Sequence, residues 1–492
     1  IPLRLVGSEM CIRDSFSTRH HHFGMGGFMK KKLLCLLLAG VILLTLPSCS
    51  IAGAFLFGIS RLSPGETESA AAVQSAEKES VTEPSGTQGY EYPHRRIEKL
   101  DYSKLTAEYQ FKNHPYGFDS LEEGEERRLY QCIMDAAYDI AQDHKASYYD
   151  YDYEAGRVET GASFSDIRFY KVLTAFLIDN PQIFWINSDY DFYDEGGRRY
   201  FQLYSFVSAD KAEELQQNFY QRVKEIIKGI PKGLDEFGRE LYLHDYLIDN
   251  CYYFDGTYSW LRHSAFGAIV QGWAVCEGYS EAMQLLLNLA GITATVVYGD
   301  SDDVLHEWNL VKIGDQWYHL DVTWDDLDKE EEHSFNRYCF FNVSTSFIEK
   351  NEHKLSPDYN DMTEEQIFNP GEEFMEQFNL FLPQCDSMED SYFYKNAAFI
   401  SSIGREQSVL EHLIQTARNK EPYFYIWCSD ALDTDYVYNC FFDSQSYYDY
   451  FDYVDEANAS GRTGGNWLNN DSVQTYGYDS YDKLIIIALE YQ

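Results

Sequence analysis

The pattern of apolar and polar positions is helical from residue 276 onward. Between 276 and 289 no proline occurs, and apolar side chains recur at every third or fourth position, as on one face of a helix. Gly291 follows, at the position where a left-handed residue commonly ends a helix. The pattern therefore predicts a helix whose first turn contains Cys276.

Two β-type segments follow this helix. Residues 306–313 and 316–324 flank a Gly-Asp pair, which is a signal for a two-residue hairpin turn. In the register set by this turn, His306 faces Thr323, and Asp321 is a diagonal neighbour about 7–8 Å away at the backbone. A three-residue turn would put the two side chains on opposite faces. The spacing allows a His–Asp pair without requiring one.

The chemistry of these positions points to a nucleophilic thiol. A Cys, then a His, then an Asp is the chain order of a papain-type site. Unpaired N–H groups and the helix dipole favour an anion in the first turn, so we expect a lowered pKa for the Cys276 thiol. His306 is the expected base and Asp321 the residue that orients it. His319 shares the predicted face and is the second candidate base; the alternative is a hydrogen-bonded histidine of the sheet.

Three motifs carry a resemblance to the transglutaminase-like superfamily: VCEGYS at 275–280, HEWNLVK at 306–312 and WYHLDVTWD at 317–325. The segment at 337–344 is also similar to one that follows the core in bacterial members. The resemblance spans about residues 240–350. It implies an α+β, papain-like core in which a helix carrying the Cys packs on an antiparallel sheet carrying the His and the Asp. It also implies a Cys276–His306–Asp321 triad.

Two aromatic residues are further candidates through this resemblance. Members carry an aromatic residue after the preceding helix, which makes Tyr253 a candidate for oxyanion or substrate contact. Trp273, three residues before Cys276, is a candidate for the wall of a cleft. Ordinary packing is the alternative for both.

The first sixty residues suggest export. Residues 1–28 resemble translated adapter read-through and are set aside. A positive segment and an apolar stretch from Met29 are typical of a secretory signal. The sequence Leu-Pro-Ser before Cys49 resembles a bacterial lipobox, in which Cys49 would be lipidated, although Pro47 departs from the usual small residue. A second apolar run at 51–59 leaves an uncleaved membrane anchor open, and free secretion is a third alternative. Each alternative places the protein outside the cytoplasm, with membrane contact through the N-terminus only.

Composition divides the rest of the chain. We expect a disordered tether at 61–95, a mainly helical region at 96–235, the transglutaminase-like core at 236–350, a linker at 351–389 and a small α/β module at 390–492.

Charge and cysteine spacing exclude several functions. Net charge is −41, from 80 acidic and 39 basic residues, which argues against nucleic-acid binding; a Lys-rich substrate would be attracted weakly. No Cys-x-x-Cys pair occurs, and the acidic run at 325–332 lacks the spacing of a calcium loop, so we expect no metal and no cofactor. A solvated loop is the simpler interpretation of that run.

The function that these observations favour is acyl transfer from an amide bond of a peptide or protein through a thioester. Water as acceptor gives a peptidase or amidase, and a Lys amine gives a cross-linking enzyme. The alternatives are a non-catalytic binding module on the same fold, or a structural surface protein whose Tyr-rich tail binds host or wall ligands.

Overall fold

The computed structural model describes residues 92–492 except 106–108, 113–114, 143–152, 255, 257–258, 302–303, 327–332, 363–377, 443–447 and 478–479. The predicted leader, the lipidation site Cys49 and most of the tether lie outside these residues. The described chain divides into one unit that ends at Ala397 and a second unit, Ala398–Gln492. Among the described residues, no helix is both long and apolar enough to cross a membrane.

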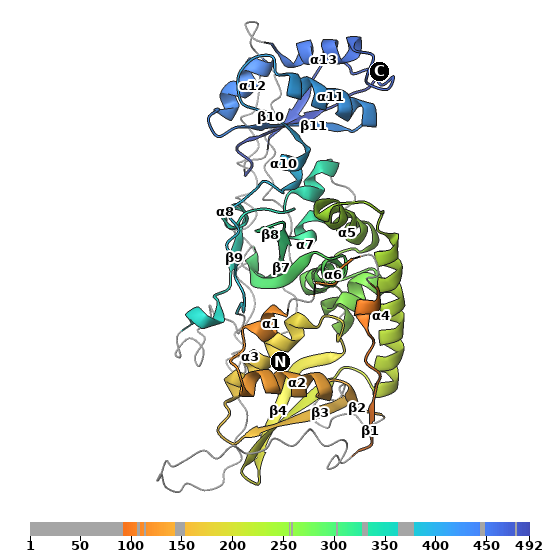
Figure 1. Cartoon of the computed structure of the whole chain (residues 1–492), viewed down its shortest axis with the longest axis vertical. Coiled ribbons are helices and arrows are strands. Elements are labelled where there is room, and N and C mark those ends of the chain that lie inside the picture. The colour runs from red at the N-terminus through yellow and green to blue at the C-terminus, as the bar shows by residue number, and fades with distance from the viewer. Residues whose placement is uncertain are drawn as a thin grey trace, which may run out of the picture. The chain divides into compact units, whose positions relative to one another are not determined.

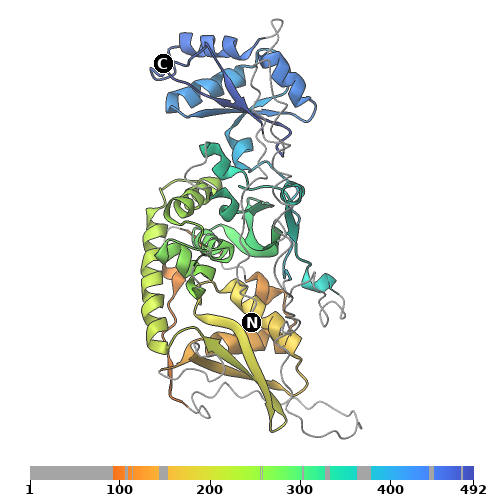
Figure 2. The same cartoon turned by 180° about the vertical axis from the view of Figure 1, so that it is seen from behind.

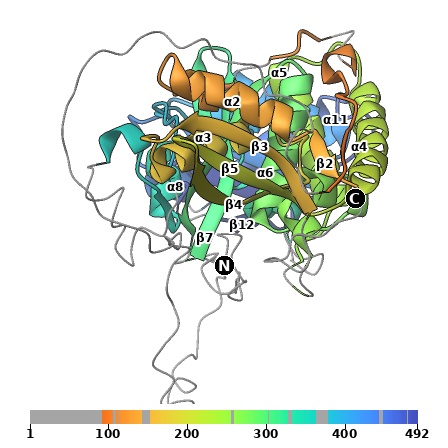
Figure 3. The same cartoon turned by 90° about the horizontal axis from the view of Figure 1, so that it is seen from below.

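The first unit begins with a mixed region of helices and strands (Figure 1). Its sheets are an antiparallel pair, β1-β2, and three antiparallel strands in the order β3-β5-β4. Figure 2 shows the long helix α4 from behind, and Figure 3 shows α2 running along β3. The elements are η1 (Tyr102–Leu105), α1 (Tyr116–Asp119), α2 (Glu125–Ala136), α3 (Asp166–Asp179), α4 (Ala209–Gly229), β1 (His94–Arg96), β2 (Asp139–Ala141), β3 (Tyr153–Gly161), β4 (Ile186–Glu195) and β5 (Arg198–Ser205).

One expectation for this region is incomplete and one is wrong. Residues 96–235 contain more helix than strand, as expected, but three strands of eight to ten residues also form a sheet there. The tether does not extend to residue 95, because His94–Arg96 pairs with β2. Composition missed this strand because a three-residue strand takes its stability from its partner and has little local signal.

The core of the first unit packs helices against a four-stranded antiparallel sheet, as the α+β, papain-like expectation required. The strand order is β8-β7-β6-β9. Helix α6 contacts both β6 and β7. The elements are α5 (Glu236–Asn250), η2 (Trp260–His263), η3 (Gly267–Gln271), α6 (Cys276–Leu289), β6 (Thr293–Ser301), β7 (Val304–Ile313), β8 (Gln316–Leu320), α7 (Val322–Asp325), η4 (Ser334–Tyr338), α8 (Thr345–Lys350), β9 (His353–Leu355), η5 (Tyr359–Asp361) and α10 (Tyr392–Asn396).

The hairpin register is the predicted one, but it ends earlier than expected. Ile313 pairs with Gln316, and the ladder continues to the Asn309–Leu320 pair. Beyond it, the Asp321 side chain accepts a hydrogen bond from the Trp324 backbone N–H at 3.0 Å and caps α7. The expectation that His306 faces Thr323 in the sheet is therefore wrong, because an N-cap Asp competes with strand extension.

The described parts of the segment expected to be a linker, 351–389, include residues that belong to the core. Strand β9 pairs antiparallel with β6, from Gly299–Leu355 to Ser301–His353. Gly299 permits this approach, because a Cβ there would lie 2.2 Å from the Lys354 carbonyl oxygen. Further along, the Asn379 side chain accepts from the Tyr298 N–H at 2.8 Å and donates to the Tyr298 carbonyl at 2.9 Å.

The second unit is a small mixed module, and it begins at 398 rather than 390. Its sheet has the order β10-β11-β13-β12, with β13 antiparallel to both β11 and β12. The apolar segment near residue 485 forms β13, which is buried and internal to the sheet. The elements are β10 (Ala397–Ile400), α11 (Gln407–Asn419), β11 (Tyr423–Cys428), α12 (Thr434–Phe442), α13 (Tyr450–Ala459), β12 (Gln474–Tyr476) and β13 (Leu484–Ala488).

Candidate active site

Cys276 is the first residue of α6, as the sequence predicts. The N-cap residue Val275 has no polar side chain, so the first N–H groups of the helix receive no side-chain cap. Gly278 allows the first turn to pack tightly, because a Cβ there would lie 2.7 Å from the Arg262 carbonyl oxygen. The helix thus presents Cys276 with uncapped backbone donors beside it.

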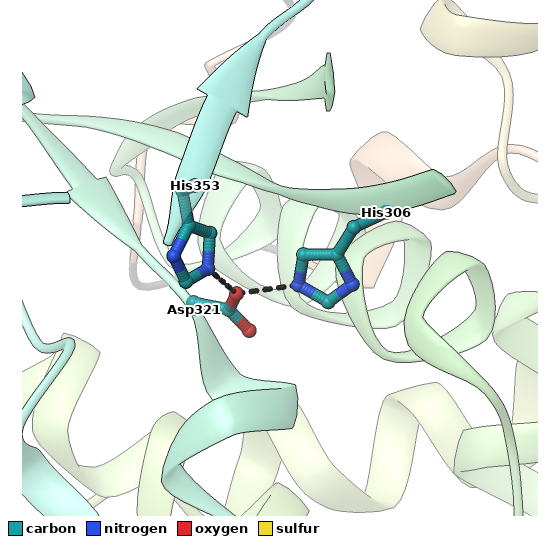
Figure 4. A group of neighbouring side chains, drawn as sticks. All are labelled: His306, Asp321 and His353. Carbon is teal, nitrogen blue, oxygen red and sulfur yellow. Dashed lines mark hydrogen bonds and ion pairs between the residues drawn. The ribbon is translucent and has the colours of Figure 1, made fainter. Parts of the chain in front are cut away.

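His306 and Asp321 are hydrogen-bonded to each other. The His306 Nε2 atom lies 2.6 Å from Asp321 Oδ2, and both side chains are fully buried. The other ring nitrogen of His306, Nδ1, is buried and has no hydrogen-bond partner among the described residues. Figure 4 shows one nitrogen of His306 directed at the carboxylate and the other pointing away from it.

The first turn of α6 is attached to strand β7 next to His306. The Glu307 backbone N–H lies within hydrogen-bond reach of the Cys276 thiol. The Ser280 hydroxyl donates to the Glu307 carboxylate at 2.5 Å, and the Asn309 side chain donates to the Ser280 carbonyl at 2.9 Å. These contacts hold the thiol against the strand that carries His306.

The electrostatic environment of Cys276 differs from the expectation. The pKa of the thiol is raised to about 12, mainly because burial removes solvent from it; the Glu307 N–H acts to lower it, and the carboxylates of Glu307, Glu277 and Asp321 add to the rise. The expectation of a lowered pKa is therefore wrong for the free protein. That expectation considered only the helix terminus and left out the effects of burial and of the nearby acids.

Asp321 accepts from three donors. Its Oδ1 receives the Trp324 N–H, and its Oδ2 lies 2.6 Å from His306 Nε2 and 3.0 Å from His353 Nε2. Burial alone would raise the pKa of Asp321, but the two imidazoles hold it well below its usual range. Asp321 is therefore an ionised carboxylate at neutral pH.

His353 was missed by the sequence analysis. It lies in β9, within the segment expected to be a linker, and no motif marks it. His306, Asp321 and His353 are residue types that bind zinc, and their ligand-type atoms lie within 4.8 Å of one another. Zinc ligands surround an ion at about 2.0–2.2 Å, whereas here the carboxylate oxygen is hydrogen-bonded directly to both nitrogens. The arrangement is that of a hydrogen-bonded site.

His319 has the role of a sheet histidine. Its Nδ1 accepts from the Trp308 indole N–H at 3.0 Å, so Nε2 carries the hydrogen and donates to the Thr345 hydroxyl at 3.0 Å. Burial lowers the pKa of His319 to about 3. Both nitrogens are occupied, so His319 has no nitrogen available as a base.

The two aromatic candidates lie on the segment that leads to Cys276. Tyr253 forms a parallel bridge with Ala274 and packs, partly buried, against the core. The Trp273 ring is half-buried and lies edge-on to Phe254 at 5.8 Å between centroids. Their proposed contacts with a substrate stay predictions.

A second buried His–Asp pair joins α5 to the end of α7. His244 lies on α5, with Nε2 3.1 Å from Asp325 Oδ2 and Nδ1 3.3 Å from Asp245 Oδ1. Burial alone would lower the pKa of His244, but these two acids raise it to about 9. Because Asp325 is the last residue of α7, this pair anchors the helix that Asp321 caps.

The described cysteines form no disulfide. They are Cys132, Cys251, Cys276, Cys339, Cys385, Cys428 and Cys440, of which Cys132 and Cys276 are partly exposed and the other five are buried.

Comparison with family models places residues 221–322 in the transglutaminase-like superfamily. This part of the chain is a transglutaminase-like domain. The matched range begins in α4, earlier than the predicted start at 240, and ends directly after Asp321. It contains Cys276, His306 and Asp321, whereas His353 lies beyond it. A search of curated proteins gives no significant match.

Solved structures that resemble part of this chain include a TGase, at 13% identity over 34% of this chain and 51% of that chain, with a TM-score of 0.21. A proposed cysteine protease from Cytophaga hutchinsonii shows 14% identity over 37% of this chain and 70% of that chain, with a TM-score of 0.20. A proposed protease from Parabacteroides distasonis shows 9% identity over 28% and 39%, with a TM-score of 0.17. The chain thus spans about half the length of the TGase, and these low scores assign no activity.

Proposed function

We propose that this protein is a thiol-dependent acyltransferase or hydrolase that acts on amide bonds of peptides or proteins. Cys276 is the nucleophile, His306 the general base and acid, and Asp321 the residue that orients the imidazole. The observation that carries the proposal is the division of roles on His306, whose Nε2 is bonded to Asp321 while its buried Nδ1 has no partner among the described residues.

The raised pKa of Cys276 favours general-base attack over a preformed ion pair. As the sulfur bonds to the amide carbonyl carbon, the thiol proton moves to His306 Nδ1. The Cys276 backbone N–H, uncapped at the start of α6, is the first donor for the developing oxyanion. Asp321 stabilises the imidazolium that forms.

Collapse of the tetrahedral intermediate breaks the carbon–nitrogen bond. His306 gives its proton to the leaving amine, and a thioester with Cys276 remains. Transfer of the acyl group to water then regenerates the thiol and gives peptidase or amidase chemistry. Transfer to a Lys amine gives a cross-link.

We place this activity outside the cytoplasm, because a signal-like stretch precedes Cys49 and a polar tether follows it. The alternative of a non-catalytic binding module has one observation in its favour, which is the raised pKa of the thiol in the free protein.

The Cys276→Ala variant tests the proposal. Amine incorporation and the release of ammonia or peptide are followed together, since the acceptor is unidentified. We expect turnover to fall by at least about a thousandfold, because the nucleophile is removed. Cys132→Ala is the matched control, since Cys132 is the other partly exposed cysteine among the described residues, and it should leave turnover unchanged. Wild-type turnover in Cys276→Ala would overturn the proposal in favour of a binding module.

A further inference from the structure

The hydrogen bonds of His353 require a charged ring. Its Nδ1 lies 2.7 Å from the Asn351 carbonyl oxygen, and its Nε2 lies 3.0 Å from Asp321 Oδ2. Both partners are acceptors without a proton to give, so each ring nitrogen must donate. Only the doubly protonated imidazolium has two N–H donors.

The surroundings of His353 suit a cation. The ring is buried with its side chain fully covered, and a buried charge is tolerated only when it is paired. The Asp321 carboxylate is that pair. Three aromatic rings lie around it, with centroids 5.2 Å away for Trp308, 5.1 Å for Trp324 and 5.3 Å for Phe340.

The titratable groups that lie near His353 come from several elements. They are Asp321 at the start of α7, His306 on β7 with ring centroids 5.5 Å apart, and His319 on β8. His319 donates to Thr345 and accepts from Trp308, so it is neutral. The charge of His353 therefore acts mainly on Asp321 and His306.

We propose that His353 is a positioning residue of this site: its imidazolium shares the Asp321 carboxylate with His306, fixes that carboxylate, and weakens the support that the carboxylate gives to a positive charge on His306. The inference rests on the proposed function in that His306 is the base. Because Asp321 already has a cationic partner, it stabilises a protonated His306 less than a lone carboxylate would. His353 also repels a second imidazolium 5.5 Å away.

The first test measures ring protonation directly in the wild-type protein. Nitrogen-15 NMR of the histidine side chains at pH 7 should show both nitrogens of His353 protonated, with the assignment made by comparison with His353→Gln. One unprotonated nitrogen on His353 at pH 7 would overturn the proposal. This measurement needs no turnover.

The second test measures alkylation of Cys276 by iodoacetamide as a function of pH, followed by mass spectrometry of the peptide that contains it. Gln at 353 keeps an N–H directed at Asp321 but removes the charge. We expect the midpoint of the pH–rate profile for alkylation to move about one pH unit lower in His353→Gln, because a protonated His306 becomes more favourable. At a pH below the midpoint, alkylation should therefore be roughly tenfold faster than in the wild type. His319→Gln is the matched control, since it removes a neutral buried histidine of the same sheet and should leave the profile in place.

Two outcomes separate the effect of charge from a purely structural role. A structural role would lower the melting temperature of His353→Gln and leave the alkylation profile where it is, which would overturn the proposal. Replacing His306 with Asn as well should abolish the shift, because His353 acts through that ring. Failure of the proposed function would instead appear as retained turnover in Cys276→Ala, which neither test uses.

Discussion

Asp321→Asn is the substitution with the sharpest expected outcome, because the two oxygens of Asp321 receive different donors. Oδ1 accepts the Trp324 N–H that begins α7, and Oδ2 lies beside the Nε2 atoms of His306 and His353. Asn has one acceptor and one donor group. If its oxygen keeps the Trp324 N–H, its NH₂ group meets two imidazole N–H groups, and His306 must move its proton to Nδ1. If the oxygen faces the imidazoles, the cap of α7 is lost.

Both orientations of the amide in Asp321→Asn are unfavourable, but one removes a helix cap and the other changes the tautomer of His306. Loss of the cap costs about 1 kcal/mol of stability. The other orientation places the proton of His306 on the nitrogen that should accept it, and in serine proteases such a change of tautomer lowers kcat by about 10⁴-fold. Either way a buried His353 loses its counter-ion, and breaking a buried pair costs about 3–5 kcal/mol. We expect turnover to fall about 10³–10⁴-fold and the melting temperature to fall as well.

The assay compares turnover, thermal melting and pH dependence with those of Asp235→Asn. Asp235 caps α5 by accepting the Gly238 N–H at 2.8 Å, and Asn serves about equally well as an N-cap, so this control should change little. The pKa of Asp321 is depressed in the folded state, so its contribution to stability is present above about pH 4 and is lost as pH falls through the folded value. The stability gap between wild type and Asp321→Asn should therefore narrow in acid. An Asp321→Asn protein that keeps a tenth or more of wild-type turnover would refute the roles given to Asp321 and His306.

Two further substitutions test the residues around the site. His319→Gln should leave turnover near wild type and lower the free energy of unfolding, measured with urea, by about 1–3 kcal/mol, because the Trp308 indole N–H loses its acceptor. If turnover collapsed in a variant that still folds, His319 would again be a candidate base. His244→Leu should cost about 3–5 kcal/mol, because it leaves Asp325 buried without its partner. In the folded protein the pKa of His244 is raised to about 9. The difference in unfolding free energy between wild type and His244→Leu should therefore be full below about pH 6.5 and decline as pH rises through 9. A difference that stays constant up to about pH 10 would contradict the ion pair.

Local signals in the sequence were sufficient to place Cys276 at the start of a helix and to set the register of the hairpin. The start of α6 at Cys276 follows from apolar periodicity, and the Gly-Asp turn sets the pairing of Ile313 with Gln316. Both features depend on residues close together in the chain. For the same reason, the sequence could show that a two-residue turn allows His306 and Asp321 to pair.

The features that were not predicted depend on contacts between distant segments. Strand β9 has three residues and pairs with β6, more than fifty residues earlier, so nothing local marks His353 as part of the sheet. The pKa of Cys276 is raised mainly by burial and also by Glu307 and Asp321, and all three effects arise only in the folded chain. The rule that a helix terminus favours a thiolate is sound, but it is one influence among several at a crowded site.

The position of Asp321 is set by contacts at both ends of α7. A four-residue helix cannot be stable by itself, because nucleation costs more than one turn returns. At its start, Asp321 is held by His353, and the Asp321 N–H donates to the Phe340 carbonyl at 3.1 Å. At its end, Asp325 accepts the Phe340 N–H at 2.9 Å and pairs with His244. The geometry of the His306–Asp321 pair therefore depends on α5 and β9 as much as on the hairpin. His353 lies outside the matched range of 221–322, so a fragment cut to that range would carry all three proposed triad residues and still lack the second imidazole on Asp321.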